Sequence, residues 1–144
     1  MNPHFDSNQA IKLFIDQLKA DLLLELPGID AHLKLAPEIR INDLKTLQQP
    51  TNALESAVLI LLYPYQSKLH TVVILRNEYD GTHSGQISLP GGKVEKTDVD
   101  YKYTALREAQ EEIGIIAADI EIIGQLSRFY VIPSNFNIYP FVAF

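Results

Sequence analysis

The spacing of hydrophobic residues near the start of the chain predicts an amphipathic helix over residues 8–25. Apolar side chains recur there at three- and four-residue steps, which places them on one helical face: Ile11, Phe14, Ile15, Leu18, Leu22 and Leu23. Ser7 stands at the expected N-cap, and Pro27 and Gly28 are expected to end the helix. Residues 35–52 hold prolines among polar side chains and predict an extended connection.

Two short apolar runs, over residues 57–63 and 69–75, predict strands. Residues 64–68 between them are rich in turn formers, so the two strands are expected to form a β-hairpin. Further strands are predicted over residues 120–123, 125–131 and 137–144. The first two runs are almost continuously apolar, a pattern typical of strands covered on both faces. The predicted fold class is therefore mixed α/β (α+β), with a mixed sheet between helices.

Residues 77–93 are rich in glycine, aspartate, serine and proline and predict a shaped loop. A second helix is predicted over residues 99–113. Asp98 is its candidate N-cap, and Gly114 stands where helices often close with a left-handed residue.

Acidic residues gather on one side of this second helix. At about 100° per residue, Glu108, Glu111 and Glu112 fall within a single sector of roughly 100°. A separate sector is apolar and contains Ala105, Leu106, Ala109 and Ile113. Like charges three and four residues apart destabilise a helix, so the cluster requires solvent or a cation. Mg²⁺ prefers oxygen ligands and commonly bridges carboxylates to phosphates, so these residues fit either a solvated acidic face or a metal site.

Composition and charge narrow the classes of function. The 144 residues are 47% hydrophobic, which is enough for one compact domain. The net charge of -6 argues against a nucleic-acid binder, but a metal could supply local positive charge for a small phosphorylated substrate. The absence of cysteine excludes disulfides and thiolate chemistry. Residues 1–14 lack a signal-peptide pattern and no apolar run is long enough to span a membrane, so we expect a soluble, cytoplasmic protein.

The motif around the acidic helix resembles the signature of the Nudix hydrolase family. That signature reads Gly, five residues, Glu, seven residues, then Arg-Glu-apolar-x-Glu-Glu-x-Gly-apolar. Gly92 begins the match, and residues 107–115 supply its last nine positions, with Ala109 at the apolar one. Asp98 replaces the first Glu, and eight residues instead of seven separate it from Arg107.

These departures resemble the coenzyme A pyrophosphatase branch of the family. The matching residues are Arg76, Gly85, Pro90, Gly91, Gly92, Asp98 and residues 105–112. Gly81 stands where that branch has a second Arg, Leu89 replaces its Phe, and Asn77 replaces its Ser or Ala. The resemblance implies hydrolysis of coenzyme A to 3′,5′-ADP and phosphopantetheine. ADP-ribose, dinucleoside polyphosphates and oxidised nucleotides are alternative substrates, and a non-catalytic nucleotide-binding or regulatory module is the alternative from another class.

The resemblance further implies a Mg²⁺ or Mn²⁺ ion held by the helix carboxylates. Glu108 and Glu112 would bind the metal, with Glu111 as a third ligand or as the group that orients the attacking water. The carbonyl group of Gly92 is a further implied ligand. Arg107 would complete the catalytic set by holding the carboxylates through charge-assisted hydrogen bonds.

Contacts with a small nucleotide substrate are implied at Arg76, His83 and Gln86, around the glycine-containing loop. Arg76 would bind a phosphate, with a structural ion pair as the alternative. His83 would contact a phosphate, with an exposed loop position as the alternative. Glu95 is a candidate for a metal or water contact, and Asp98 is expected to act as a helix cap.

The resemblance runs from roughly Ala57 to the end of the chain. We expect residues 54–144 to form the Nudix domain, with residues 1–53 as an N-terminal helix and extended connection. Family members generally continue with another strand and a covering helix, whereas this chain ends at Phe144. We therefore expect either that the C-terminal part of the fold is missing or that a second protomer completes the core of a homodimer. The second option follows if Phe141, Val142 and Phe144 are left uncovered.

Overall fold

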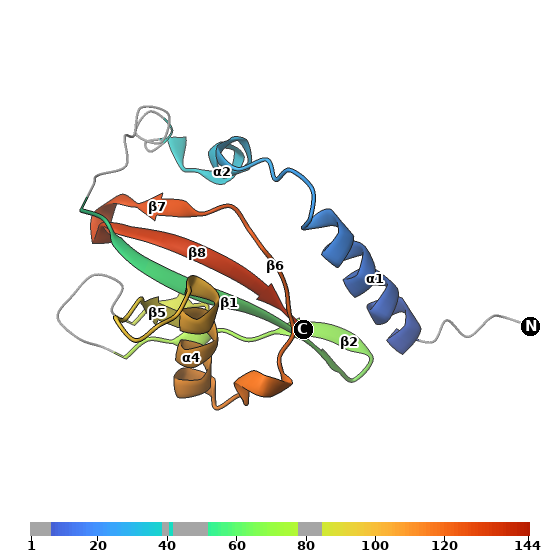
Figure 1. Cartoon of the computed structure of the whole chain (residues 1–144). Helices are drawn as coiled ribbons and strands as arrows, with labels where there is room; N and C mark the ends of the chain where they lie inside the picture. The colour runs from blue at the N-terminus through green and yellow to red at the C-terminus, as the bar shows by residue number, and fades with distance from the viewer. Residues whose placement is uncertain (1–6, 39–40, 42–51, 78–84) are drawn as a thin grey trace, which may run out of the picture.

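The computed structural model of the chain describes residues 7–38, 41, 52–77 and 85–144. A mixed β-sheet lies between helix α1 (Ser7–Asp21) on one side and helix α4 (Tyr101–Ile113) on the other, as Figure 1 shows. The predicted fold class, a mixed sheet between helices with an additional N-terminal helix, is confirmed.

Strand β1 (Leu54–Tyr65) is the centre of the sheet. It runs parallel to β8 (Phe136–Ala143) and antiparallel to β2 (Lys68–Thr71) and β5 (Gly91–Lys93). Beyond β8, the antiparallel strands β6 (Ile122–Gln125) and β7 (Phe129–Val131) complete the sheet. Short 3₁₀ helices precede β6 and follow β7, at Ala117–Asp119 and Ile132–Ser134.

The predicted hairpin is present, but its second strand is shorter than expected. Gln66 and Ser67 have φ angles of 46° and 61°, the left-handed pair typical of a two-residue hairpin turn. Strand β2 ends at Thr71 instead of Leu75. Residues 74 and 75 do not pair with β1. They form a separate strand, β3 (Ile74–Leu75), which pairs with β4 (Ile87–Ser88).

The predicted loop at residues 77–93 is only partly a loop. It contains β4 and β5, two strands of two and three residues. Strands this short leave no periodic signal in a sequence, because they are defined by the backbone groups with which they pair. Residues 78–84 lie outside the described part of the chain.

The sheet separates two hydrophobic cores. The first lies between β1, β8 and α4 and includes Ala57, Leu59, Leu61, Ala105, Ala109, Phe141 and Ala143. The second lies between α1 and the opposite face and includes Ile15, Ile123 and Val142. Burial of these apolar faces stabilises the three layers, and it confirms the apolar sector predicted for the second helix.

The first helix ends earlier than predicted. It stops at Asp21, and the backbone N–H groups of Leu23 and Leu24 then bond to carbonyl groups three residues back, at 3.2 and 3.1 Å. Leu23 is 86% exposed, so it does not belong to the buried face. After Pro27 and Gly28 the chain forms a further short helix, α2 (Ile29–Leu35), which the sequence pattern did not indicate.

Asp100, rather than Asp98, caps the second predicted helix. The Oδ1 atom of Asp100 accepts a hydrogen bond of 2.6 Å from the N–H of Tyr103, and α4 begins at Tyr101. Asp98 lies outside the helix because its carboxylate binds the Arg107 guanidinium. Gly114 closes α4 with φ 70°, as predicted.

The apolar end of the chain is covered. Phe141 and Val142 are 7% and 5% exposed, because the first packs in the α4 core and the second in the α1 core. Phe144 packs against the α1 core as well. The exposed apolar patch expected at these residues is therefore absent. Within the described part of the chain, no helix combines the length and apolarity needed to cross a membrane.

Candidate active site

Two glycines of β5 allow the carboxylates of α4 to approach the sheet. A Cβ atom added at Gly92 would overlap the carboxyl carbon and both oxygens of Glu108. The N–H of Gly91 donates a hydrogen bond of 2.8 Å to Oε2 of Glu112. Gly91 has φ 152°, and a Cβ there would overlap the backbone of Ala57 and Val58 in β1. Glu108 and Glu112 thus both face the Gly91–Gly92 backbone.

Arg107 connects α4 to the segment that follows β5. Its Nε and Nη2 atoms donate to the two carboxylate oxygens of Asp98 at 3.0 and 3.1 Å. Nη2 also donates to the carbonyl of Lys93 at 3.2 Å and lies 2.9 Å from Oε1 of Glu108. Nη1 lies 3.3 Å from Oε1 of Glu111. One guanidinium group therefore binds two helix carboxylates and the end of β5.

Asp98 is the best-satisfied carboxylate near the site. Its side chain is fully buried and also accepts hydrogen bonds from the hydroxyl of Thr104 and the N–H of Glu95, both at 2.9 Å. The hydrogen bonds from Arg107 are the main reason why the pKa of Asp98 is lowered to about 2. Asp98 is therefore charged at neutral pH and holds Arg107 in place.

Glu108 has the opposite electrostatic environment. Burial raises the pKa of Glu108 above its usual value, and the nearby charges of Glu111 and Glu112 raise it further, whereas Arg107 lowers it. Its side chain is only 17% exposed. A buried carboxylate beside two others gains stability from an additional positive charge.

Glu111 is directed differently from the other two glutamates. Its side chain is 59% exposed and pairs with Arg107. Among the residues that the structure describes, no three acidic or histidine side chains come together as a ready-made metal site. The helix rotation correctly placed the glutamates on one side of α4, but only Glu108 and Glu112 face the glycine backbone.

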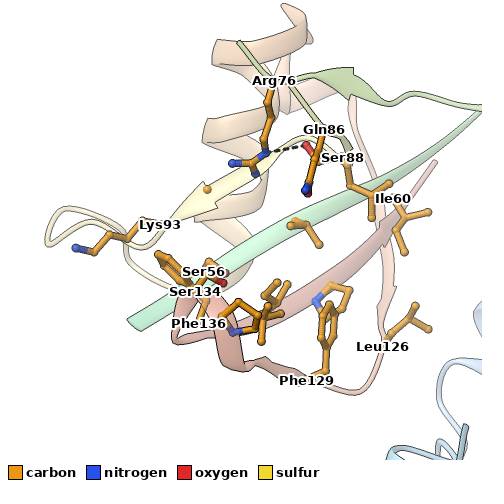
Figure 2. A pocket seen from close by; sticks show the side chains of 17 residues that line it. Ser56, Ile60, Arg76, Gln86, Ser88, Lys93, Leu126, Phe129, Ser134 and Phe136 are labelled. Carbon is orange, nitrogen blue, oxygen red and sulfur yellow. Dashed lines mark hydrogen bonds between the residues drawn. The ribbon is translucent and has the colours of Figure 1, made fainter. Parts of the chain in front are cut away.

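A cavity of about 790 Å³ opens on the other face of the sheet, beside these glycines. Figure 2 shows Phe129 and Phe136 on one side of it and Arg76, Gln86 and Ser88 on the opposite side. Gly92 and Lys93 line the cavity as well, so β5 borders both the cavity and the α4 carboxylates. An apolar wall and a polar wall therefore face each other across this cavity, and only its β5 border also contacts the acidic helix.

Two of the three predicted substrate contacts lie in this cavity. Arg76 and Gln86 both line it, and the Nε of Arg76 donates a hydrogen bond of 3.1 Å to the hydroxyl of Ser88. The third, His83, lies outside the described residues. The backbone N–H of Glu95 donates a hydrogen bond to the Asp98 carboxylate. The side-chain carboxylate of Glu95 makes no hydrogen bond or ion pair with the described residues.

Residues 53–139 match the NUDIX domain family, and this match covers more than half of the chain. The chain belongs to the Nudix family. The match includes β5, α4 and the strands of the cavity, so the family resemblance seen at Gly92 and Arg107–Ile115 is confirmed.

The relatives of this Nudix chain include a coenzyme A diphosphatase. It is 31% identical over 106 residues to the peroxisomal coenzyme A diphosphatase NUDT7 of Mus musculus, covering 74% of this chain and 44% of that protein. It is 41% identical over 75 residues to Nudix hydrolase 15, mitochondrial, of Arabidopsis thaliana, covering 51% and 26%. The chain thus spans between a quarter and a half of the length of these relatives.

The Nudix fold is also present in solved structures similar to this one. A MutT/nudix family protein from Enterococcus faecalis superposes with a TM-score of 0.53 and 20% identity, over 81% of this chain and 47% of that chain. At this identity the similarity supports the fold alone.

The sequence reasoning missed several residues of the Nudix cavity. Ser88 and Lys93 belong to its polar part, and Phe129 and Phe136 form its apolar wall. Ser88 and Lys93 carried no usable signal, because β4 and β5 are too short to be predicted from periodicity. Phe129 and Phe136 had none, since their convergence depends on the pairing of β7 with β8.

Proposed function

We propose that the chain is a metal-dependent Nudix hydrolase that cleaves the pyrophosphate bond of a nucleoside diphosphate linked to another moiety. The observation that carries this proposal is the approach of Glu108 and Glu112 to the Gly91–Gly92 backbone, on a strand that also borders the cavity. A ligand that extends from the cavity past β5 would bring its pyrophosphate to these two carboxylates.

The donor set fits Mg²⁺ or Mn²⁺. Glu108 and Glu112 would bind the ion, Gly92 would add its carbonyl oxygen, and Glu111 would serve as a third ligand or orient the attacking water. All of these are the hard oxygen ligands that such ions prefer. Burial, together with the charges of Glu111 and Glu112, raises the pKa of Glu108, and a bound cation would offset both effects. When bound, the ion would supply an activated water and neutralise charge on the phosphoryl group.

The other residues of the set act by positioning. Arg107 holds Glu108 and Glu111 while Asp98 holds Arg107, so the directions of the carboxylates are set by hydrogen bonds. Gly91 donates to Glu112 and keeps one of its oxygens on the β5 side. We assign Arg107, Glu108, Glu111 and Glu112 to catalysis and Arg76, His83 and Gln86 to substrate binding.

Coenzyme A or a derivative is the proposed substrate, with 3′,5′-ADP and phosphopantetheine as products. Two observations support it: the similarity to a coenzyme A diphosphatase and a cavity with an apolar wall opposite Arg76. Such a cavity suits a ligand that combines phosphates with a less polar portion. ADP-ribose is the second candidate, because Gly81 replaces an Arg of the coenzyme A branch.

We also propose that residues 54–144 form the hydrolase domain and residues 1–53 an accessory segment. Because α1 packs on the sheet, a chain that lacks residues 1–53 should melt at a lower temperature, although every residue proposed for metal or substrate binding lies in residues 54–144.

The decisive test compares turnover in the unmodified chain and in the Glu112→Gln variant. With Mg²⁺ or Mn²⁺, the unmodified chain should cleave coenzyme A, ADP-ribose or another member of a nucleotide panel, with products read by mass. Glu112→Gln should lower kcat by about 100-fold or more, because the substitution removes a charged metal ligand.

Glu121→Gln is the matched control, since Glu121 is exposed and pairs only with Lys19 among the described residues. It should keep full turnover. Full activity of Glu112→Gln would refute the role of that residue. Cleavage of ADP-ribose without cleavage of coenzyme A would reject the first-choice substrate, and nucleotide binding without any turnover would favour the non-catalytic module.

A further inference from the structure

We propose that Ser88 is a positioning residue that presents the Arg76 guanidinium to a phosphate group of the substrate, an inference that rests on the proposed function. Neither the family motif nor the relatives assign a role to this serine. Strands β3 and β4 form a small separate sheet, and Ser88 and the neighbouring Arg76 and Gln86 supply the polar wall of the cavity.

Pairing of these two short strands places Arg76 and Ser88 on the same face. Leu75 lies opposite Ile87, and the N–H of Arg76 donates to the carbonyl of Gln86 at 3.0 Å. Because side chains alternate along a strand, Arg76 and Ser88 point to one face and Leu75 and Ile87 to the other. Leu75 and Ile87 are both 72% exposed, whereas Arg76 and Ser88 are half-buried and line the cavity.

The hydrogen bond between the two side chains fixes one edge of the guanidinium. Nε of Arg76 donates to Oγ of Ser88 at 3.1 Å, and Figure 2 shows this bond within the cavity. The two terminal amino groups are left as the edge that can bind two oxygens of a phosphate. In the described part of the chain, no carboxylate lies within ion-pair distance of Arg76.

Anchoring matters because a free arginine loses its rotamer freedom when it binds an anion. Ser88 already restricts Arg76, so less freedom remains to be lost when the substrate binds. Gly92, which approaches Glu108, lines the same cavity. The anchored guanidinium lies on the cavity wall and not among the α4 carboxylates, so we expect its loss to appear mainly in KM.

The test is a cycle of the variants Ser88→Ala, Arg76→Ala and the double variant, with Ser88→Thr and Ser67→Ala beside them. Ser88→Ala should raise KM by roughly 3- to 10-fold with kcat within about 2-fold, as expected for loss of one hydrogen bond. Arg76→Ala should raise KM by roughly 10- to 100-fold. The double variant should match Arg76→Ala, because Ser88 acts through Arg76.

Ser88→Thr keeps the hydroxyl and should restore KM to within about 2-fold of the unmodified chain. Ser67→Ala makes the same chemical change in the exposed β1–β2 turn and should leave KM unchanged. Melting temperatures measured in parallel separate positioning from a purely structural role. An unchanged KM in Ser88→Ala, or an equal Ser88 effect with and without Arg76, would overturn the inference.

Titration with ADP in the absence of turnover keeps this inference separate from the proposed function. If the unmodified chain binds ADP without hydrolysing any substrate, the function is rejected, and the same ratios in Kd decide the role of Ser88. If it hydrolyses a nucleotide and Ser88→Ala behaves like the unmodified chain in both KM and Kd, only the inference is rejected. Absence of both turnover and ADP binding would overturn both.

Discussion

Asp98 carries a fully buried charge beside the candidate active site, and Arg107 is its ionic partner within the described residues. Because its folded-state pKa is lowered from 3.8 to about 2, chiefly by Arg107, this carboxylate stabilises the fold above pH 4. The contribution should be lost as the pH falls from about 4 to 2. Removing the charge leaves Arg107 without its main acceptor.

The Asp98→Asn variant tests this effect. At pH 7 it should be less stable than the unmodified chain by roughly 2–4 kcal/mol, measured by urea unfolding. The difference should shrink toward pH 3, where the unmodified chain begins to lose the same interaction. Glu108 has a raised pKa and contributes a pH dependence of opposite sign, but it is present in both chains. A difference that stays constant from pH 7 to pH 3 would contradict the prediction.

At these residues the sequence predicted the side of the helix on which each side chain lies better than it predicted the hydrogen-bond partners of that side chain. Helical rotation correctly put Glu108, Glu111 and Glu112 on one side of α4. The pair of Arg107 and Glu111 is an i,i+4 contact within α4. Helical rotation could not predict, by contrast, that Arg107 also binds Asp98, because that contact requires the segment between β5 and α4 to fold back on the helix. For the same reason Asp98 looked like a cap although Asp100 fills that position.

Among the elements, long periodic segments were predictable and short paired ones were not. The helices α1 and α4 and the β1–β2 hairpin follow from periodicity and turn chemistry, since each is long enough to repeat its pattern. The strands β3, β4 and β5 are two or three residues long and exist through their partners. The cavity walls depend on these strands and on the β7–β8 pairing, so the cavity itself lay beyond sequence reasoning.

Helix α1 should act as part of the same cooperative unit as the sheet. Ile15 is 3% exposed and packs with Ile123 and Val142. Ile15→Ala should therefore lower the free energy of unfolding by about 2–5 kcal/mol through lost burial and the remaining cavity. Phe14→Ala, at a position that is 52% exposed on the same helix, should change it by less than about 1 kcal/mol. Equal losses in thermal or urea unfolding would mean that α1 does not cover the sheet.

At the scale of the whole molecule, the structure removes the basis for the expected homodimer. That expectation rested on uncovered apolar residues at the end of the chain, and both cores cover them. The homodimer, the absence of nucleic-acid binding and the cytoplasmic location stay predictions. The relatives bear on the last of these only through their names, which include mitochondrial and peroxisomal proteins.

Stability of the whole fold should report metal binding independently of turnover. A ligand at about 100 times its Kd stabilises the folded state by about 2.7 kcal/mol, so Mn²⁺ should raise the melting temperature of a chain of this size by roughly 5–10 °C. Glu108→Gln removes a largely buried negative charge, which avoids its desolvation cost and its repulsion from Glu111 and Glu112 in the metal-free protein while weakening the metal site. The variant should therefore melt at an equal or higher temperature without Mn²⁺, yet gain little when it is added. Glu121→Gln, at an exposed residue that pairs with Lys19 of α1, should gain as much as the unmodified chain. A smaller Mn²⁺ shift in Glu108→Gln would not reflect a general loss of stability, because this variant should melt at an equal or higher temperature without Mn²⁺. Equal Mn²⁺ shifts in all three proteins would instead place the ion somewhere other than Glu108.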